Sequence, residues 1–493
     1  MDLKKLQNGS DIRGIALEGV KGEQVNLTPQ VIEHIAMAFV AWLAEHTGAS
    51  KPTVAIGTDS RISGPKLKSA FIDGAVKTGA RVLDFGMAST PAMFMATVDD
   101  ELKVDGSVMV TASHLPFNRN GLKFFTSQGG LDKPDIAAIL QLASQPKQLK
   151  SQEPQPNAVA QVDFMEKYCQ SLVECVRKAG GEQPLSGMKI IVDAGNGAGG
   201  FFAHKVLTPL GADVTGSQFL NPDGRFLNHV PNPEDKTAMA SICEAVVKNK
   251  ADLGIIFDTD VDRSAIVDCT GNPINRNALI ALIGSVVLCE HPGSTIVTDS
   301  VTSDGLARFI TAHGGVHHRY RRGYRNVINE GIRINREGGE CWLAIETSGH
   351  AALRENYFLD DGAYLVAKLL VEVARLKKQG RQLQELIADL KQPCESKELR
   401  FAIATPHFKA YGEQVLAELQ QLVSEQDGWE IVTPNHEGVR VACTSAQEQG
   451  WFLLRQSLHD PVLPLNIESN VEGGVERIEK RVLQLLSRFD QLS

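Results

Sequence analysis

The chain has 493 residues, which predicts roughly three domains of about 150 residues each and excludes a single small module. Hydrophobic residues make up 43% and charged residues 22% of the sequence, as in folded proteins. The 59 acidic and 50 basic residues give a net charge of −9. This balance leaves no strongly basic face for a phosphate backbone, so we expect no nucleic acid partner.

Three features bear on the compartment. The longest uncharged apolar run, residues 278–289, is well short of the roughly twenty residues that a membrane span needs. The first residues show neither an apolar signal core nor the composition of a transit peptide. The 8 cysteines lack the close pairs of a zinc site and the pattern of a disulfide framework. We therefore expect a cytoplasmic protein with reduced cysteines and no membrane contact.

Short apolar runs alternate with helical periods along most of the chain. Helices are predicted at residues 31–45 and 364–378, and strands at residues 54–56, 190–192, 253–257 and 343–345. This alternation favours α/β domains with mostly parallel sheets covered by helices. Ligands of such sheets bind beyond the carboxyl ends of the strands, so the polar loops that follow the apolar runs are the candidate sites.

Three stretches rich in turn residues predict linkers, at residues 144–157, 269–273 and 391–396. The segments between them are each long enough to bury a core. The prediction therefore rises from three domains to four, at residues 1–150, 157–270, 271–391 and 395–493.

The first candidate loop contains Ser113 and follows an apolar run. A serine hydroxyl is a weak nucleophile unless a base or a metal assists it. The G-x-S-x-G elbow of serine hydrolases is absent, so ester or peptide hydrolysis has little support. On its residues alone, Ser113 is either a turn residue or a nucleophile, and Lys123 reads as a surface lysine.

Residues 195–200 match the G-x-G-x-x-G pattern of a dinucleotide-binding turn after a strand. Asp193 counts against that interpretation, because it would set a carboxylate close to the pyrophosphate. The alternative is a tight turn between a strand and a helix.

Three aspartates alternate in the loop that follows the apolar run 253–257: Asp258, Asp260 and Asp262. Three acids so close repel one another unless a cation neutralises them, and an all-carboxylate set suits Mg²⁺ better than zinc. One alternative is a solvated acidic turn. Another is a phosphatase of the haloacid dehalogenase type, in which Asp258 would be the nucleophile.

Two later regions offer polar side chains. Glu346, Ser348 and His350 follow an apolar run and suit hydroxyl recognition and proton transfer, although a loop histidine is often structural. Two basic stretches can hold phosphate or be ordinary solvated faces: Arg319, Arg321, Arg322 and Arg325, and the run 455–457.

Taken in order, these loops resemble the α-D-phosphohexomutase superfamily over nearly the whole chain. The resemblance rests on residues 11–14, 111–116, 195–200, 221–234, 258–263 and 346–350. That family interconverts hexose 1-phosphates and hexose 6-phosphates through a phosphoserine enzyme and a bisphosphate intermediate. It implies three α/β domains with mixed sheets and a smaller α+β carboxy-terminal domain around a central cleft.

The resemblance also implies a role for each loop. Ser113 would carry the phosphoryl group and would bind Mg²⁺ together with Asp258, Asp260 and Asp262. The candidates for proton transfer are Lys123, Arg13 and His350. The expected substrate contacts are His114, Arg263, Arg322, Arg325, Glu346, Ser348, Arg455, Ser457 and His459. Sugar phosphates would be the partners and a hexose 1,6-bisphosphate the activating intermediate, in a monomer or homodimer.

The sequence departs from the family pattern in two loops. The family's carboxy-terminal loop usually reads Arg-x-Ser-Gly-Thr-Glu-Pro, where this chain has Leu458 and His459 after Ser457; Leu115 replaces a usual asparagine. Losing the glycine restricts the backbone and His459 replaces a hydroxyl, so we expect altered phosphate binding. A phosphoglucomutase or phosphomannomutase activity is the leading expectation. The alternatives are a hexose 1,6-bisphosphate synthase with a sugar-bisphosphate donor, a phosphoglucosamine mutase, the phosphatase above and a catalytically silent sugar-phosphate binding protein.

Overall fold

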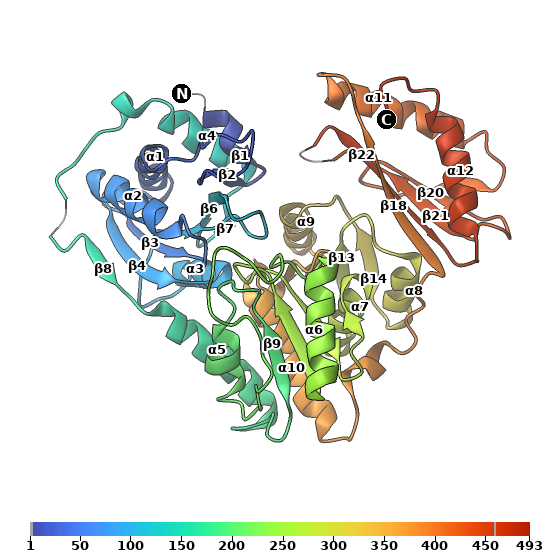
Figure 1. The fold of residues 1–493 in the computed structure, drawn as a ribbon, viewed down its shortest axis with the longest axis horizontal. Helices are drawn as coiled ribbons and strands as arrows, with labels where there is room; N and C mark the ends of the chain where they lie inside the picture. Colours follow the sequence, from blue (N-terminus) through green and yellow to red (C-terminus); the bar gives the residue numbers. More distant parts are fainter. Residues whose placement is uncertain (1–2, 155, 458–459) are drawn as a thin grey trace. The chain divides into compact units, whose positions relative to one another are not determined.

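A computed structural model describes residues 3–154, 156–457 and 460–493 and divides into two compact units (Figure 1). The first unit consists of the residues through Leu279 together with Ser348–Glu385. The second consists of Ile280–Thr347 and Leu386–Ser493. In the described part of the chain, no helix combines the length and the apolar character needed to cross a membrane.

The first unit begins with a sheet of order β1-β2-β6-β5-β3-β4-β8, with β7 paired to β6. Its strands are β1 Gln7–Asn8, β2 Asp11–Ile15, β3 Thr53–Thr58, β4 Arg81–Met87, β5 Gly106–Val110, β6 Arg119–Thr126, β7 Gly129–Gly130 and β8 Val159–Gln161. The helices are η1 Leu3–Leu6, α1 Pro29–Thr47, α2 Gly64–Lys77, α3 Thr90–Thr97, α4 Lys133–Ala143 and η2 Pro146–Gln148. Helices α1, α2 and α4 share one apolar core with the sheet, and α3 packs against β5 and β6.

Helix α1 shows how the sequence sets these elements. The Thr28 hydroxyl accepts a hydrogen bond from the Val31 backbone N–H at 3.3 Å and caps the first turn. Gly48, with a φ of 75°, ends the helix in the left-handed conformation that glycine adopts most readily. Phe39 faces inward, and its ring centroid lies 4.7 Å from that of Phe124 on β6. The apolar face therefore joins the helix to the sheet that carries the site.

The second sheet of the first unit has the order β12-β11-β10-β9. Its strands are β9 Ile190–Asp193, β10 Leu253–Phe257, β11 Ser264–Asp268 and β12 Pro273–Ile274. The first unit also contains the antiparallel strands β16 Ala351–Leu353 and β17 Leu359–Asp360. The helices are α5 Phe164–Gly180, the π-helix η3 Phe202–Leu207, α6 Lys236–Asn249, η4 Arg354–Asn356, α10 Gly362–Lys377 and η5 Leu383–Ile387. Helices α5 and α10 pack together, and Tyr168 on α5 donates to Asp361 at 2.8 Å.

Two sequence expectations need correction. The sheets are mixed rather than mostly parallel, because the chain turns back after β5 and after β10 to form antiparallel pairs with β6 and β11. The predicted linker at residues 269–273 is the turn between β11 and β12, which belong to one sheet. Its Gly and Pro residues mark a hairpin, since turn residues are common to hairpins and linkers alike.

The glycine run 195–200 is packed by the chain itself. A Cβ atom on Gly200 would lie 2.1 Å from the Leu220 carbonyl oxygen, and one on Gly197 would lie 2.7 Å from that of Thr259. Asp193 is buried and accepts hydrogen bonds from Gly195 N at 2.9 Å and His229 Nε2 at 3.0 Å. The run is a tight turn whose glycines allow close backbone contact, not a cradle for a dinucleotide.

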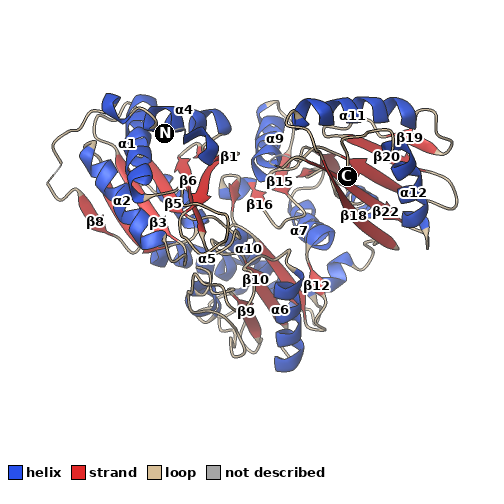
Figure 2. Ribbon diagram, turned by 45° about the horizontal axis from the view of Figure 1, so that its top comes forward, coloured by secondary structure: helices blue, strands red, loops and turns tan. Residues whose placement is uncertain are grey.

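The second unit contains three parallel strands and an antiparallel carboxy-terminal sheet. Figure 2 labels strands β18, β19, β20 and β22 of the latter. The parallel strands are β13 Thr295–Thr298, β14 Val316–Arg319 and β15 Cys341–Ile345, with helices α7 Arg276–Glu290, α8 Asp304–Ala312 and α9 Tyr324–Arg336. Helix α7 begins in the first unit. The carboxy-terminal sheet has the order β18-β22-β21-β20-β19 and is formed by β18 Glu395–Ala402, β19 Trp429–Ile431, β20 Val439–Cys443, β21 Gly450–Leu454 and β22 Val462–Ser469. Helices α11 Phe408–Val423 and α12 Gly474–Leu486 share one core with it.

Candidate active site

Ser113 lies in the loop between β5 and β6 and is 2% exposed. Its φ of 51° falls in the left-handed region, where few residues other than glycine lie. The Ser113 hydroxyl donates a hydrogen bond to Asp258 Oδ2 at 3.0 Å and accepts one from Arg263 Nη2 at 3.2 Å. The hydroxyl is therefore held between a carboxylate and a guanidinium.

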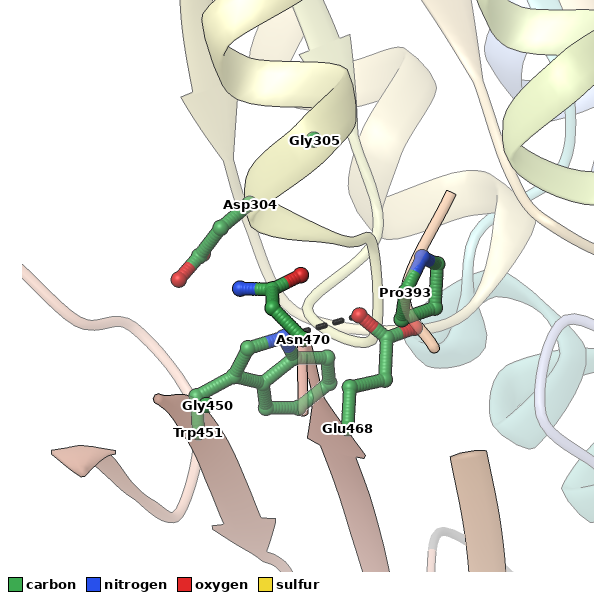
Figure 3. Close-up of a pocket in the computed structure, with 7 residues that line it drawn as sticks. All are labelled: Asp304, Gly305, Pro393, Gly450, Trp451, Glu468 and Asn470. Carbon is green, nitrogen blue, oxygen red and sulfur yellow. Dashed lines mark hydrogen bonds between the residues drawn. The ribbon is translucent and has the colours of Figure 1, made fainter. Parts of the chain in front are cut away.

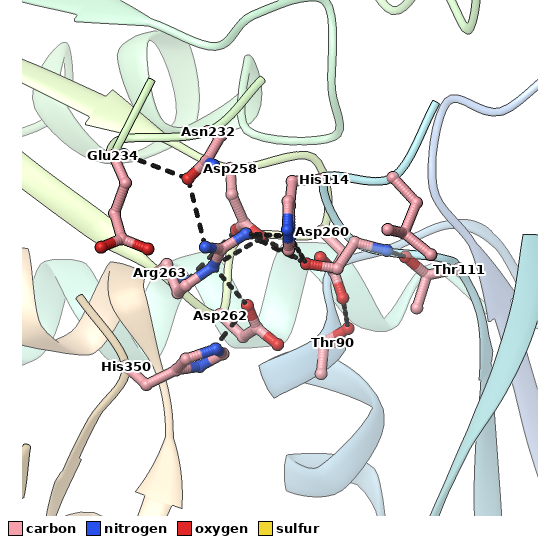
Figure 4. A network of polar contacts seen from close by, with 12 residues as sticks. Thr90, Thr111, His114, Asn232, Glu234, Asp258, Asp260, Asp262, Arg263 and His350 are labelled. Carbon is pink, nitrogen blue, oxygen red and sulfur yellow. Dashed lines mark hydrogen bonds and ion pairs between the residues drawn. The ribbon is translucent and has the colours of Figure 1, made fainter. Parts of the chain in front are cut away.

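The three aspartates lie in the turn between β10 and β11, and all are buried. One carboxylate oxygen from each lies within 4.8 Å of the others. Burial, followed by the charges of Asp262 and Asp260, raises the pKa of Asp258 well above its usual range. The structure thus brings Ser113 to the acidic loop, as the resemblance implied, and Figure 4 shows the network around these aspartates.

Lys123 is buried on β6, not a surface lysine as its residue type alone suggested. Its ammonium group donates to Asp260 Oδ2 at 2.9 Å and also to Asp262 Oδ2. Thr90 Oγ1 donates to the same Asp260 oxygen at 2.5 Å. Burial by itself would raise the pKa values of Asp260 and Asp262. The charge and hydrogen bonds of Lys123, together with other nearby donors and cations, outweigh burial, so both pKa values lie below the usual range.

Two carboxylate oxygens of this cluster remain without a hydrogen bond. Asp260 Oδ1 and Asp262 Oδ1 are buried, and neither accepts a hydrogen bond from any described residue. Buried acceptors in proteins are rarely left so. Together with Asp258 they offer the all-oxygen donor set that hard divalent cations prefer, so the acidic residues can hold a metal ion.

Arg263 connects the serine loop to the acidic loop (Figure 4). Its Nη2 atom donates to Asp258 Oδ2 at 3.1 Å and to His114 Nδ1 at 2.7 Å, and its Nη1 atom donates to Asn232 Oδ1 at 3.2 Å. Burial, then the charges of Arg263 and Arg13, lower the pKa of His114 to about 2. His114 is therefore neutral, with Nδ1 as the acceptor and Nε2 left to carry the proton.

His350 lies beside the acidic loop in the same unit. Its Nδ1 atom is 2.5 Å from Asp360 Oδ2 and 3.9 Å from Asp262 Oδ1. Burial alone would lower the pKa of His350, but the carboxylates of Asp360 and Asp262 outweigh it and raise the pKa to about 9. Arg13, on β2, donates to Asp11 Oδ2 at 2.8 Å and reaches the Ala112 carbonyl oxygen at 3.5 Å. Ser348, also in the first unit, is buried.

The other expected contacts belong to the second unit. Glu346 accepts a hydrogen bond from the Gly323 N–H at 2.6 Å, just before Tyr324 begins α9. Arg455 is 5% exposed, its Nε atom is buried without a hydrogen-bond partner among the described residues, and burial lowers its pKa. The remaining members of this set are Arg322, Arg325 and Ser457. The expected contact from His459, and the altered residue Leu458, lie outside the described residues.

Sequence reasoning missed four side chains that organise the site: Arg61, Thr90, Asn232 and Asp360. Arg61 follows β3, and Asp360 ends β17, so both lie just after or at the end of strands, where polar loops were expected. That position was the available signal. The carbonyl oxygens that Arg61 binds are distant in sequence, whereas Asp360 contacts His350, only ten positions away.

The fold and the site together define a class of protein. Two buried loops of mixed α/β sheets hold a serine hydroxyl and three carboxylates, and a strand holds a lysine beside them. This arrangement suits group transfer at a hydroxyl with a divalent cation. The chain belongs to the phosphoglucomutase/phosphomannomutase family: residues 4–150, 166–271 and 275–394 match its alpha/beta/alpha domains I, II and III. The predicted superfamily and fold class are confirmed.

Named relatives agree with this family. The chain is 30% identical over 471 residues to a phosphomannomutase/phosphoglucomutase of Pseudomonas aeruginosa, covering 95% of this chain and 94% of that one. It is 30% identical over 473 residues to a phosphoglucomutase of Neisseria gonorrhoeae, covering 96% and 94%. The structure of a phosphoglucomutase/phosphomannomutase family protein from Burkholderia thailandensis matches with a TM-score of 0.79 and 26% identity over 97% and 96% of the two chains. These matches do not favour the alternative activities.

Proposed function

We propose that this protein interconverts the 1-phosphate and 6-phosphate of glucose or mannose through a phosphoserine at Ser113 and a hexose 1,6-bisphosphate intermediate. One observation carries the proposal: the Ser113 hydroxyl donates to Asp258 Oδ2 at 3.0 Å. A hydroxyl that can act as a nucleophile therefore contacts the three aspartates that could hold a metal ion. Relatives named phosphoglucomutase and phosphomannomutase support the same activity.

The proposed metal ligands are Ser113, Asp258, Asp260 and Asp262. Asp260 Oδ1 and Asp262 Oδ1 support this set, because neither accepts a hydrogen bond within the described part of the chain, and so does its purely oxygen chemistry. Bound Mg²⁺ would supply positive charge against the oxygens of the transferred phosphoryl group. Lys123 adds positive charge at the same carboxylates, so its ammonium group and a cation both stabilise the cluster.

Transfer of the phosphoryl group from Ser113 to a sugar hydroxyl requires a group that takes the hydroxyl proton. We assign proton transfer to Lys123, Arg13 and His350, which lie in the unit that holds Ser113. The imidazole of His350 carries a proton at neutral pH because Asp360 and Asp262 face it, so it suits the donation step. Arg263 steadies the hydroxyl and, through His114, leaves an imidazole N–H for the substrate.

Recognition of the sugar and of its distal phosphate is assigned to the loops of the second half of the chain. Glu346 and Ser348 suit the sugar hydroxyls. The proposed phosphate contacts are Arg322, Arg325, Arg455, Ser457 and His459. The Nε atom of Arg455 supports this assignment, because it is buried and has no hydrogen-bond partner among the described residues. In this proposal the four domains at residues 1–150, 157–270, 271–391 and 395–493 each supply one loop, in a cytoplasmic monomer or homodimer.

A ³¹P NMR time course with glucose 1-phosphate and Mg²⁺ tests the activity. We expect glucose 6-phosphate to form, and to form faster with a catalytic amount of glucose 1,6-bisphosphate. Release of inorganic phosphate would indicate a phosphatase instead, and accumulation of the bisphosphate would indicate a synthase. No change at all would indicate a binding protein.

Intact mass tests the phosphoserine directly. Protein incubated with glucose 1,6-bisphosphate should gain one phosphoryl group, and Ser113→Ala should not. Ser107→Ala is the matched control. Ser107 is also buried, on β5 just before the serine loop, but it donates to the Met93 carbonyl oxygen at 2.5 Å. A phosphoryl group that persists in Ser113→Ala would contradict the assignment.

A further inference from the structure

The loop that carries Ser113 is bound by Arg61, which follows β3 and is 1% exposed. Arg61 Nη1 donates to the carbonyl oxygens of Pro116 at 2.8 Å and Arg119 at 3.0 Å. Its Nη2 atom donates to the carbonyl oxygen of Leu115 at 2.6 Å and to that of Ser113 itself. One side chain therefore binds four backbone oxygens of the segment from Ser113 to Arg119.

The Ser113 peptide is fixed on its other side as well. The Ser113 N–H donates to Thr111 Oγ1 at 2.9 Å, so both backbone polar groups of Ser113 are bonded to side chains. This matters because a φ of 51° is unfavourable for a serine and persists only where the surroundings impose it. In this conformation the hydroxyl reaches Asp258.

Arg61 is itself held rigidly. Its Nε atom pairs with Asp59 Oδ2 at 3.3 Å, and its backbone N–H donates to Asp59 Oδ1 at 3.0 Å. The Phe226 ring covers the guanidinium, with 5.3 Å from Cζ to the ring centroid. A Cβ atom on Gly224 would lie 2.5 Å from Ile62 N, so the segment with Phe226 packs directly on the backbone beside Arg61. The guanidinium is thus buried between Asp59, Phe226 and the serine loop.

We infer that Arg61 is a positioning residue for phosphoryl transfer, which holds the backbone of Ser113 so that its hydroxyl meets the acidic loop. The inference rests on the proposed role of Ser113. Among the described residues, the Arg61 guanidinium bonds backbone oxygens and pairs with Asp59, so it acts through the loop and not on the reacting atoms. A planar fork with five N–H groups can serve four carbonyl oxygens, whereas a lysine ammonium has three N–H groups at one point.

The step that depends on this clamp is phosphorylation of the free serine. The Ser113 oxygen forms a bond to a phosphorus of the hexose bisphosphate, and the bond from that phosphorus to the sugar oxygen breaks. The serine proton ends on the sugar oxygen, which leaves phosphoserine and a hexose monophosphate. Because such transfers need the reacting atoms aligned within fractions of an ångström, a released loop slows the step more than it weakens sugar binding.

The test uses the full chain with Arg61→Met, Arg61→Lys and the double variant Asp59→Asn/Arg61→Met. The double variant avoids leaving a buried carboxylate without its partner, and Arg61→Lys keeps a cation beside Asp59. Arg177→Met is the matched control, because Arg177 also donates to backbone carbonyl oxygens, those of Glu182 and Pro209, but away from the serine loop. Thermal melting shows which variants are folded at the assay temperature.

Two readouts separate positioning from stability. The first is the rate at which dephosphorylated protein gains a phosphoryl group from glucose 1,6-bisphosphate, followed by quenched-flow intact mass. The second is kcat and KM for glucose 1-phosphate. We expect the rate and kcat to fall roughly 10- to 100-fold in the methionine variants, with KM within about twofold of wild type. Arg61→Lys should lose less, and Arg177→Met should match wild type.

A folded Arg61 variant that phosphorylates Ser113 at the wild-type rate would overturn the inference. So would a loss confined to KM, because a clamp on the nucleophile acts on the transfer step. Failure of the proposed function has a different outcome, in which the wild-type protein itself gains no phosphoryl group at Ser113.

Discussion

His350 Nδ1 and Asp360 Oδ2 lie 2.5 Å apart, and the second oxygen of the same carboxylate accepts the Ala351 N–H at 3.0 Å. Asp360 therefore orients the imidazole and the backbone that carries it. Replacing Asp360 by Asn removes the charge and keeps the shape. We expect kcat to fall by roughly tenfold, because the His350 imidazole is then less often in its productive orientation. Steady-state kinetics on Asp360→Asn measures this. An unchanged kcat in the folded variant would show that the pair is only structural.

Lys123 donates to two of the carboxylates that we propose as ligands of a divalent cation, so both would neutralise the same charges. Removing the ammonium in Lys123→Met leaves Asp260 and Asp262 buried without their cationic partner, which costs about 3–5 kcal/mol in comparable cases. We expect the melting temperature of this variant to drop in a chelator and to recover more than that of wild type when Mg²⁺ is added. Equal Mg²⁺ responses in the two proteins would argue against shared neutralisation.

Glu468, on β22, borders a small pocket and accepts a hydrogen bond from Trp451 Nε1 at 2.9 Å (Figure 3). Burial raises its pKa to about 7, although Trp451 and Arg440 lower it. A carboxyl whose pKa is higher in the folded than in the unfolded protein stabilises the fold below its unfolded pKa, near 4.5, and that contribution disappears as the pH rises through about 7. Its size is on the order of 3 kcal/mol.

Glu468→Gln tests this titration, because the amide oxygen can still accept from Trp451 and cannot ionise. We expect the variant to gain stability relative to wild type between pH 5 and pH 8, by several degrees in melting temperature. Parallel pH profiles for the two proteins would assign the pH dependence to other groups.

The glycine run after β9 offers a paired test of packing. Gly200→Ala would push a Cβ atom to 2.1 Å from the Leu220 carbonyl oxygen, and we expect a loss of several kcal/mol, about 3 or more. Gly284 lies inside α7, and beyond its chain neighbours and the nearby helix backbone no atom of the described residues lies within 4 Å of an added Cβ. Gly284→Ala should therefore gain up to about 1 kcal/mol from helix propensity. Chemical denaturation compares the two. Similar effects would contradict the packing role of the run.

The parts of the site that could be predicted from the residues alone are those whose side chains are close together in the sequence. Asp258, Asp260 and Asp262 alternate after an apolar run, and that local pattern is enough to indicate a cation site at a strand end. Ser113 was ambiguous on its residues alone, because what distinguishes it is its hydrogen bond to Asp258, 145 positions away. The resemblance to a family supplied that pairing.

Features that depend on long-range packing could not be predicted. Lys123 reads as a surface lysine because its type is usually exposed, and only the antiparallel return of β6 buries it against the acidic loop. Arg61 has no neighbouring partner except Asp59, since its four acceptors are carbonyl oxygens that carry no side-chain signal. The linker prediction at residues 269–273 was wrong for a different reason. Turn residues do not reveal whether the next strand joins the same sheet.

The first unit is discontinuous, and this has a consequence for synthesis on the ribosome. Helix α5 ends at Gly180, but its packing partner α10 begins at Gly362, after the segment Ile280–Thr347 of the other unit has been made. At a synthesis rate of about 5–20 residues per second, α10 follows α5 after roughly ten to forty seconds. During this time the face of α5 that packs on α10 has no partner helix. His350 and Asp360 are delayed with α10. The nascent chain thus completes its chemical centre late, with an unfinished helical face that chaperones can bind in the meantime.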